Sequence, residues 1–449
     1  MNFAQNLLAA RHHIVVILGV CVSTALIAAL DGSEANSGAP RATVPHHEVP
    51  ATRHRPLTAG EVLAARTAWR YFENNTQPTG LANSADKYPA ATLWDSSSYL
   101  LAVIAAYRLG IITREQFDAR ISAAFAALTA LPLFDGKLPN KSFNTISLAM
   151  VDYNNRATTR GIGWSAIDVG RILVPIDILV WQYPQHTERA RKLLATWSFS
   201  SLVKDGYLQG AALNANNGIT LQQEGRLGYE GYAAKSLALM GLDVSVATRP
   251  LDNIKYVKTF GVPVPADSRE PEKYHAHNYV TSEPYMLDGL EYGWDHTSAD
   301  LAFLVFDAQR ARYLSTGTLT AVTEDNIDEK PYFVYNTVYS SGKSWNTITD
   351  NGADASDHRS LSVKAAFAWH ALYDNDYTAK LFAFAAPLAD PNRGYFAGWY
   401  EAKQRPNRAI TCNTNAIILE SLAYRAFGPS ITSTAVPVAM ATATGTRHE

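Results

Sequence analysis

The sequence predicts a mainly α-helical domain, an (α/α)6 toroid with a few short β-hairpins at one mouth. Helix-length runs recur along the chain, each with apolar residues three and four positions apart and each stopped by glycine or a turn. Several of these runs are apolar on more than one face, which is typical of helices packed inside a ring. Segments with strand character are few and short.

Six of the helical runs have the apolar character expected of the inner ring. They lie at 94–110, 164–181, 229–241, 298–317, 360–373 and 413–428. More amphipathic runs at 58–75, 113–131 and 186–202 are expected outside them. The pairs Thr58/Glu61, Thr113/Gln116 and Thr297/Asp300 each predict a capping box at a helix N-terminus. The irregular spacing of the runs disfavours a solenoid of uniform hairpins.

Three segments are expected to be extended and to decorate one mouth of the ring. Residues 133–153 resemble a hairpin in pattern, and 253–265 and 331–339 are further extended pieces. The stretch 282–295 (SEPYMLDGLEYGWD) is dense in acids and aromatics, and its pattern predicts a loop that forms a wall of the ligand site or an ion site.

The N-terminus has the pattern of an export signal. Arg11, His12 and His13 precede an uncharged run from Ile14 to Leu30. Small residues permit cleavage after Ala35, and the length of the run equally permits an uncleaved membrane anchor. We therefore expect a protein of the periplasm or cell envelope, secreted or anchored in the inner membrane by this segment.

Composition along the chain predicts four parts. Residues 1–35 form the signal peptide or N-terminal membrane anchor, and 36–57 form a disordered linker with almost no large apolar residues. The folded domain spans 58–428. Residues 429–449 have the composition of the linker and are expected to form a disordered tail.

The overall composition excludes several classes of protein. Of the 449 residues, 47% are hydrophobic, which suits a sizeable core, and the net charge of -2 provides no basic field for nucleic acid. The two cysteines, Cys21 and Cys412, are too few for a thiolate zinc site. His275 and His277 have no evident third ligand, and no phosphate-binding glycine loop or serine-hydrolase motif occurs. Neither a metal nor another cofactor is expected.

Aromatic residues make up 11% of the chain, and many stand at helix starts or in polar loops. Sugar rings stack on such side chains, and nearby polar groups bind the hydroxyls. Each aromatic taken singly also suits a half-buried structural position, but their coincidence with acids indicates a carbohydrate ligand. The candidate substrate-binding residues are Trp94, Tyr153, Trp164, Arg171, Glu224, Tyr229, Glu283, Tyr285, Glu291 and Trp294.

Glu230 is the first candidate for a catalytic acid. It shares a helical face with Ala233, Ala234 and Leu237, and burial on that face would raise its pKa toward the range of a general acid. A structural ion pair with an arginine is an equal alternative. Glu224, in the preceding loop, is the alternative acid.

Asp168, Asp95 and Asp152 are the candidates for a base or a substrate ligand. Asp168 and Asp95 stand on predicted inner helices, and Asp152 lies in a polar, aromatic loop. Two structural alternatives remain open: Asp168 could pair with Arg171 one turn later, and Asp152 could shape a turn. Glu324 is a further candidate on a loop.

The order of several motifs resembles a known family. The chain resembles bacterial exported glucoamylase-like domains (domain of unknown function 3131), a likeness carried over residues 60–428 by AWRYFENNTQPTGLANS, TLWDSSSYLLAVIAAYRLGIIT, LPLFDGKLPNKSFNT, GIGWSAIDVGRIL and LGYEGYAAKSLALMGLDV. It is more distantly similar to the glucoamylase-like domain of cyclic β-1,2-glucan synthases and to β-1,2-glucanases. The resemblance implies the toroid and inverting glycoside hydrolysis. By position, Glu230 resembles the acid of the relatives' G-Y-x-E helix, one place earlier here, and Asp168 resembles the aspartate of their inner helix.

The sequence therefore predicts an exported glycoside hydrolase-like protein acting on a bacterial glucan or exopolysaccharide by inversion. The alternative is a non-catalytic glycan-binding or scaffold component of an envelope polysaccharide system. A lyase or epimerase, drawing on His275, His277 and Tyr279, is a third hypothesis. Inversion requires an acid and a base about 6.5–9.5 Å apart, with water between them.

Overall fold

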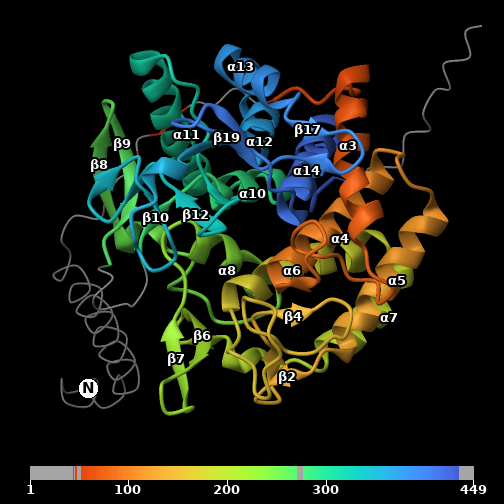
Figure 1. Cartoon of the computed structure of the whole chain (residues 1–449). Helices are drawn as coiled ribbons and strands as arrows, with labels where there is room; N and C mark the ends of the chain where they lie inside the picture. The colour runs from red at the N-terminus through yellow and green to blue at the C-terminus, as the bar shows by residue number, and fades with distance from the viewer. Residues whose placement is uncertain (1–43, 45, 48–51, 270–276, 434–449) are drawn as a thin grey trace, which may run out of the picture. The chain divides into compact units, whose positions relative to one another are not determined.

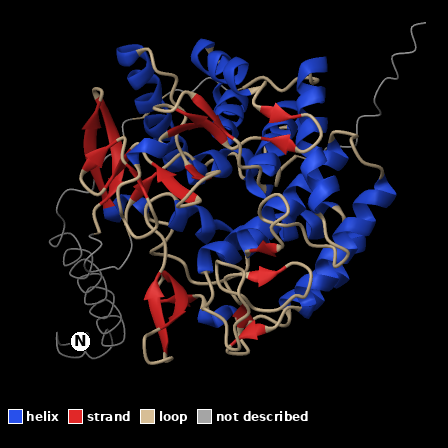
Figure 2. Ribbon diagram, viewed as in Figure 1, coloured by secondary structure: helices blue, strands red, loops and turns tan. Residues whose placement is uncertain are grey.

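The computed structural model describes residues 44, 46–47, 52–269 and 277–433 (Figure 1). Helices dominate this part of the chain, and short strands stand between them (Figure 2). None of the helices within these ranges is both long and apolar enough to cross a membrane. The predicted signal or anchor, His275, and the tail beyond Ser433 lie outside the described residues.

The helices of the described part agree closely with the predicted runs. Their bounds are α3 (Ala59–Asn75), α4 (Leu93–Arg108), α5 (Arg114–Ala130), α6 (Ala166–Gln182), α7 (Thr187–Leu194), α8 (Tyr229–Leu239), α10 (Glu283–Glu291), α11 (His296–Thr316), α12 (Val363–Tyr373), α13 (Asp376–Ala385) and α14 (Cys412–Phe427). The run at 186–202 is helical only over α7, and a 3-10 turn at Phe199–Ser201 follows it. The helix α13 was not predicted.

Six helices pack against one another in a closed cycle. α4 contacts α6, α6 contacts α8, α8 contacts α10, α10 contacts α12, α12 contacts α14, and α14 returns to α4 (Figure 1). These helices are apolar on several faces, as the sequence predicts: every residue of α12 is buried. Gly170 permits the close approach of α6 to α8, because a Cβ there would lie 2.6 Å from the carbonyl oxygen of Ala233.

The other helices lie outside this cycle. α3 packs on α14, α5 on α4, α7 on α5 and α6, α11 on α10, and α13 on α12. The run at 298–317 was predicted as an inner helix, and that assignment is wrong, because it forms the outer helix α11. Its inner place belongs to α10, in the stretch predicted as a loop. α10 is only nine residues long and carries Pro284 and three acids, yet all nine residues are buried.

The capping predictions had mixed outcomes. The boxes at Thr58/Glu61 and Thr113/Gln116 are confirmed, and a third, Thr92/Asp95, begins α4. The predicted box at Thr297 is wrong. Asp295 caps α11 instead, paired with Ser298. Aspartate is at least as good an N-cap as threonine, so the helix begins two residues earlier.

The strands form small antiparallel sheets. Residues 133–153 contain the hairpin β2 (Leu133–Phe134) and β3 (Leu138–Pro139), whereas β4 (Phe143–Asn144) pairs with β1 (Ala90–Ala91). The extended segment near 253–265 is the hairpin β8 (Ile254–Thr259) and β9 (Val262–Asp267), and 331–339 contains β12 (Phe333–Asn336). The remaining strands are β5 (Val203–Lys204), β6 (Tyr207–Leu213), β7 (Ile219–Gln223), β10 (Tyr279–Val280), β11 (Glu324–Asn326), β13 (Tyr339–Ser340), β14 (Lys343–Ser344), β15 (Thr347–Ile348), β16 (Ser360–Ser362), β17 (Ala389–Asp390), β18 (Gly394–Tyr395), β19 (Gly398–Tyr400) and β20 (Arg405–Asn407).

Part of the predicted linker packs on the folded domain. The Thr52 hydroxyl donates to the carbonyl of Leu372 at 2.5 Å, and the main-chain N–H of Arg55 donates to the carbonyl of Arg425 at 3.1 Å. The Arg55 side chain also binds the buried Glu61 at 2.8 Å. The ordered domain therefore begins upstream of residue 58.

Candidate functional site

The first turns of four inner helices meet at Glu283, the first residue of α10. The indole Nε1 of Trp94, on α4, donates to Glu283 Oε1 at 3.1 Å, and the amide of Asn413, on α14, donates to the same oxygen at 2.6 Å. Lys364, on α12, forms an ion pair with the other carboxylate oxygen. Glu283 is fully buried, so this junction ties α4, α10, α12 and α14 together.

The first turns of α6 and α8 lie at the same end of the helices. The ring of Tyr229, on α8, is centred 6.0 Å from that of Trp94, and its hydroxyl lies 3.2 Å from Thr281 just before α10. Asp168, in the first turn of α6, interacts electrostatically with Asp95 in the first turn of α4. Helix N-termini carry partial positive charge, which favours the ionised form of the carboxylates gathered here.

Four carboxylates at this end are half-buried and still reach solvent: Asp95, Asp168, Glu224 and Glu324. We call them the carboxylate cluster. Burial raises the pKa of Asp168 to about 7, and the charges of Glu224 and Asp95 add to the effect. Burial also raises the pKa of Glu324 to about 7, against the opposing charges of Lys364 and Arg171. Groups with such values exchange protons near neutral pH.

Asp168 and Glu224 differ in how well their charged forms are stabilised. Burial raises the pKa of Glu224 too, but Lys141, the Ser165 hydroxyl and main-chain N–H groups at the start of α6 oppose it. Glu224 Oε2 accepts from the N–H of Ala166 at 2.5 Å. More groups thus stabilise the charged form of Glu224 than that of Asp168, and the charge of Glu224 raises the pKa of Asp168.

The backbone makes room for the Glu224 carboxylate. Gly210, on β6, lies directly beside it, and a Cβ at that position would stand 2.6 Å from Oε2. Glu224 follows β7, and the glycine at position 210 of the paired strand β6 leaves room for its carboxylate at the N-terminus of α6. The hairpin β6–β7 was not predicted from the sequence, and so this relationship was missed.

Three tyrosines border the carboxylate cluster. Tyr153 is 66% exposed and interacts electrostatically with Asp168 and Glu224. Tyr335 pairs across the strands β11 and β12 with Glu324, and its ring stacks on Tyr279 with centroids 3.8 Å apart. Tyr335 also interacts with Tyr153, so the tyrosines connect the Asp168/Glu224 side of the cluster with the Glu324 side. Phenol rings beside carboxylates suit recognition of a sugar.

Glu230 lies in a buried ion pair. Its Oε2 lies 2.7 Å from Arg269, and its Oε1 accepts from Gln223 at 2.8 Å. Burial raises the pKa of Glu230, and Arg269 works against that rise. Both oxygens have protein partners and the residue is 3% exposed, so these contacts favour the structural alternative. Arg269 is 39 positions away in the chain, so no local sequence pattern predicts its ion pair with Glu230.

Asp95 and Asp152 both shape local backbone. Asp95 Oδ2 accepts from the main-chain N–H and the hydroxyl of Thr92, each at 3.0 Å, which completes the capping box of α4. Asp152 Oδ1 accepts from the N–H groups of Asn154 and Arg156, each at 2.9 Å. The turn-forming alternative therefore accounts for Asp152.

Arg171 and Glu291 form a buried charged layer. Arg171 is fully buried, stands over the Trp94 ring at 4.4 Å, and lies 3.4 Å from Glu291 and 3.8 Å from Glu420. Burial and the charge of Glu291 raise the pKa of Glu420 well above its usual range. Arg171 packs against the Trp94 ring, and Arg171 and Glu291, the two predicted substrate contacts in this layer, have no exposed surface.

Three predicted aromatic contacts are also structural. Trp164 is 1% exposed, and its indole N–H donates to the carbonyl of Gln209 at 3.1 Å. Tyr285 is buried, and its carbonyl accepts from the indole of Trp294 at 2.7 Å. Trp294 follows the C-terminal end of α10 and stacks on Tyr373, so it lies at the other end of that helix from Glu283.

Comparison with known proteins identifies the family. The sequence model described as "Protein of unknown function (DUF3131)" matches residues 63–428. The chain belongs to the DUF3131 family. This confirms the resemblance predicted from the sequence motifs. No curated protein sequence matches the chain.

Solved structures similar to this DUF3131 chain include two endo-β-1,2-glucanases. The enzyme from Chitinophaga pinensis, solved with sophorotriose and glucose, has a TM-score of 0.57 at 12% identity, covering 83% of this chain and 94% of its own. The enzyme from Talaromyces funiculosus, solved with sophorose, has a TM-score of 0.55 at 11% identity. The match covers 83% of this chain and 84% of that enzyme. At such identities the likeness shows a shared fold.

Proposed function

We propose that this protein is an exported glycoside hydrolase that acts on a bacterial β-glucan, with β-1,2-glucan as the first substrate to test. The observation that carries the proposal is the carboxylate cluster, in which groups with pKa values near 7 stand beside exposed and stacked tyrosines. The similar endo-β-1,2-glucanases support the choice of linkage. The closed cycle of helices supports the (α/α)6 toroid as its architecture.

Glu324 is the acid in this proposal and Glu224 is the base. Burial raises the pKa of Glu324 to about 7, so near neutral pH this residue retains a proton that it can donate to the glycosidic oxygen. Lys141 and the N–H groups at the start of α6 stabilise the charged form of Glu224, which suits it to activate a water molecule on the opposite face of the sugar. Asp168 is a positioning residue that interacts with Glu224.

The proposed reaction follows the inverting mechanism of glycoside hydrolases. The Glu324 proton moves to the leaving oxygen as the glycosidic bond breaks, and Glu224 takes a proton from the water that forms the new bond to the anomeric carbon. Tyr153 stacks on a sugar ring, and Trp94 holds Glu283 rather than the substrate. Periplasmic or envelope localisation, by cleavage or by anchoring, completes the proposal.

The experiment separates the acid from the base. Release of reducing sugar from β-1,2-glucan is measured for the wild-type protein, Glu324→Gln and Glu224→Gln, together with an activated nitrophenyl β-glycoside. Loss of the acid is expected to abolish cleavage of the glucan but to spare the activated substrate, whose leaving group needs no proton. Loss of the base is expected to abolish both, with partial rescue by azide.

The matched control is Glu230→Gln, a buried carboxylate outside the cluster. Its turnover per folded molecule is expected to match that of the wild type. Binding of β-1,2-glucan without turnover by the wild type would instead establish the non-catalytic glycan-binding alternative. Loss of turnover in Glu230→Gln alone, with an intact fold, would return the role of acid to Glu230.

A further inference from the structure

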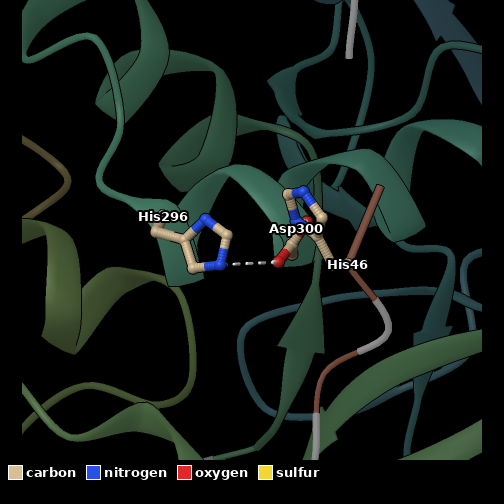
Figure 3. A group of neighbouring side chains, drawn as sticks. All are labelled: His46, His296 and Asp300. Atoms are coloured by element: carbon tan, nitrogen blue, oxygen red, sulfur yellow. Dashed lines mark ion pairs between the residues drawn. The ribbon is translucent and has the colours of Figure 1, made fainter. Parts of the chain in front are cut away.

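Three potential metal ligands meet at the start of α11. His296 and Asp300 stand one turn apart at the start of this helix, and His46 approaches from the segment that precedes the domain (Figure 3). His46 Nδ1 lies 3.4 Å from Asp300 Oδ1, and His296 Nε2 lies 4.0 Å from Asp300 Oδ2. One ligand atom from each residue can be chosen so that all lie within 4.8 Å of one another.

These spacings are close to those of a bound transition metal. Bonds of about 2.0–2.2 Å in a tetrahedron place neighbouring ligand atoms roughly 3.4 Å apart. The two imidazoles are 61% and 76% exposed, so they are free to close the remaining distance. Their rings are already 4.8 Å apart, centre to centre. Two imidazoles and one carboxylate suit zinc, with a fourth position for water.

The surrounding contacts hold the Asp300 carboxylate in place without a metal. The main-chain N–H of His47 donates to Asp300 Oδ1 at 2.9 Å, and the His47 ring packs on Phe303 with centroids 4.5 Å apart. Asp300 is only 5% exposed, so its carboxylate is fixed. A carboxylate ligand that also accepts a main-chain hydrogen bond is oriented as metal sites require.

The position of the three ligands on the domain indicates whether a bound metal could take part in the proposed hydrolysis. α10 begins at Glu283, at the end where the inner first turns meet, and its nine residues span about 13 Å. His296 follows the opposite end of α10 by five residues, so a metal here takes no part in the proposed hydrolysis. It would instead join the pre-domain segment to the outer helix α11.

We propose that His46, His296 and Asp300 form a zinc site that clamps the segment before the domain onto α11. The site connects two parts of the chain separated by about 250 positions, and Thr52 and Arg55 anchor the same segment further along. Zinc binding would therefore fix the chain at His46 to the start of α11. The proposal is independent of the function proposed above.

The test uses the untagged full chain after treatment with a chelator. Isothermal titration with Zn²⁺ alone is expected to give one site per chain, with His46→Ala and His296→Ala each weakening binding at least tenfold. Both histidines are exposed, so these variants keep the fold. Mg²⁺ is expected to give no heat of binding, because it prefers oxygen ligands.

The matched control is His54→Ala, in the same segment but packed edge-on against Tyr424. Its zinc affinity is expected to equal that of the wild type. Tryptic cleavage at the exposed Arg53 is expected to slow at least fivefold with Zn²⁺ in the wild type and in His54→Ala, but not in His296→Ala. Equal zinc affinity in the wild type, His46→Ala and His296→Ala would overturn the proposal, as would the absence of zinc binding.

Discussion

The indole of Trp94 donates a hydrogen bond to the buried carboxylate of Glu283 at 3.1 Å, across 189 positions of sequence. This bond joins the first turns of α4 and α10, two helices on different sides of the cycle. Lys364 and Asn413 bind the same carboxylate from α12 and α14. One buried acid thus fixes the end of the helices where the carboxylate cluster lies.

Substitutions at Glu283 and Lys364 are expected to have non-additive effects on the free energy of unfolding. Lys364→Met leaves the buried Glu283 and Asp325 without this cation, and should lower the free energy of unfolding by about 3–5 kcal/mol. Glu283→Gln together with Lys364→Met should cost less than Lys364→Met alone, because no unpaired charge remains at residue 283. Urea unfolding measures both, and additive effects of the two substitutions would contradict the coupling.

The ionised form of Asp177, on α6, is expected to lower the free energy of unfolding above neutral pH. It is 8% exposed, its Oδ2 has no hydrogen-bond partner among the described residues, and burial raises its pKa to about 7. The folded state thus holds the proton more tightly than the unfolded state. The stability from this group is complete below pH 4 and is lost as the pH rises through about 7.

Asp177→Asn is therefore expected to raise the free energy of unfolding at pH 8 by about 2–4 kcal/mol, given roughly 1.4 kcal/mol for each pKa unit. At pH 4 the gain should vanish. The control is Asp205→Asn, in an exposed turn, which should change stability at neither pH. An equal gain from Asp177→Asn at both pH values would rule out the titration of this group as the cause.

Tyr153→Ala is expected to weaken substrate binding without affecting the fold. Loss of a stacked ring costs about 1.4 kcal/mol, which raises KM for a β-1,2-glucan oligosaccharide about tenfold and leaves kcat unchanged. Because Tyr153 is 66% exposed, thermal unfolding should not change. Trp181→Ala, an exposed aromatic at the opposite end of α6, is the matched control and should leave KM unaltered. Equal KM for Tyr153→Ala and the wild type would remove Tyr153 from the binding site.

The pH profile of hydrolysis is expected to fall on the alkaline side near pH 7. Glu324, with a pKa of about 7, must hold its proton to act as the acid, so kcat/KM for glucan declines as that proton is lost. An activated nitrophenyl glycoside needs no acid, and its alkaline limb should disappear. A limb that persists with the activated substrate would assign it to another group.

Local sequence patterns predicted most helices well because the information lies within a few turns. Thr58 and Thr113 were placed correctly as N-caps, and the inner runs of α4, α6, α8, α12 and α14 are apolar on several faces. The same reasoning failed at α10, where Pro284 and three acids in nine residues obscure the periodicity. Its place is determined by packing against α8, α11 and α12.

The sequence by itself determined the helical class, the family and the small set of acids from which a site could be built. The tertiary structure decided which acids have partners in the protein. Glu230, Glu283 and Glu224 were all candidate site residues, but Arg269 and Lys364 bind Glu230 and Glu283 from distant segments. Helix formation depends on neighbours within a few residues, whereas the ionisation of a carboxylate depends on burial and on charges brought close only by folding.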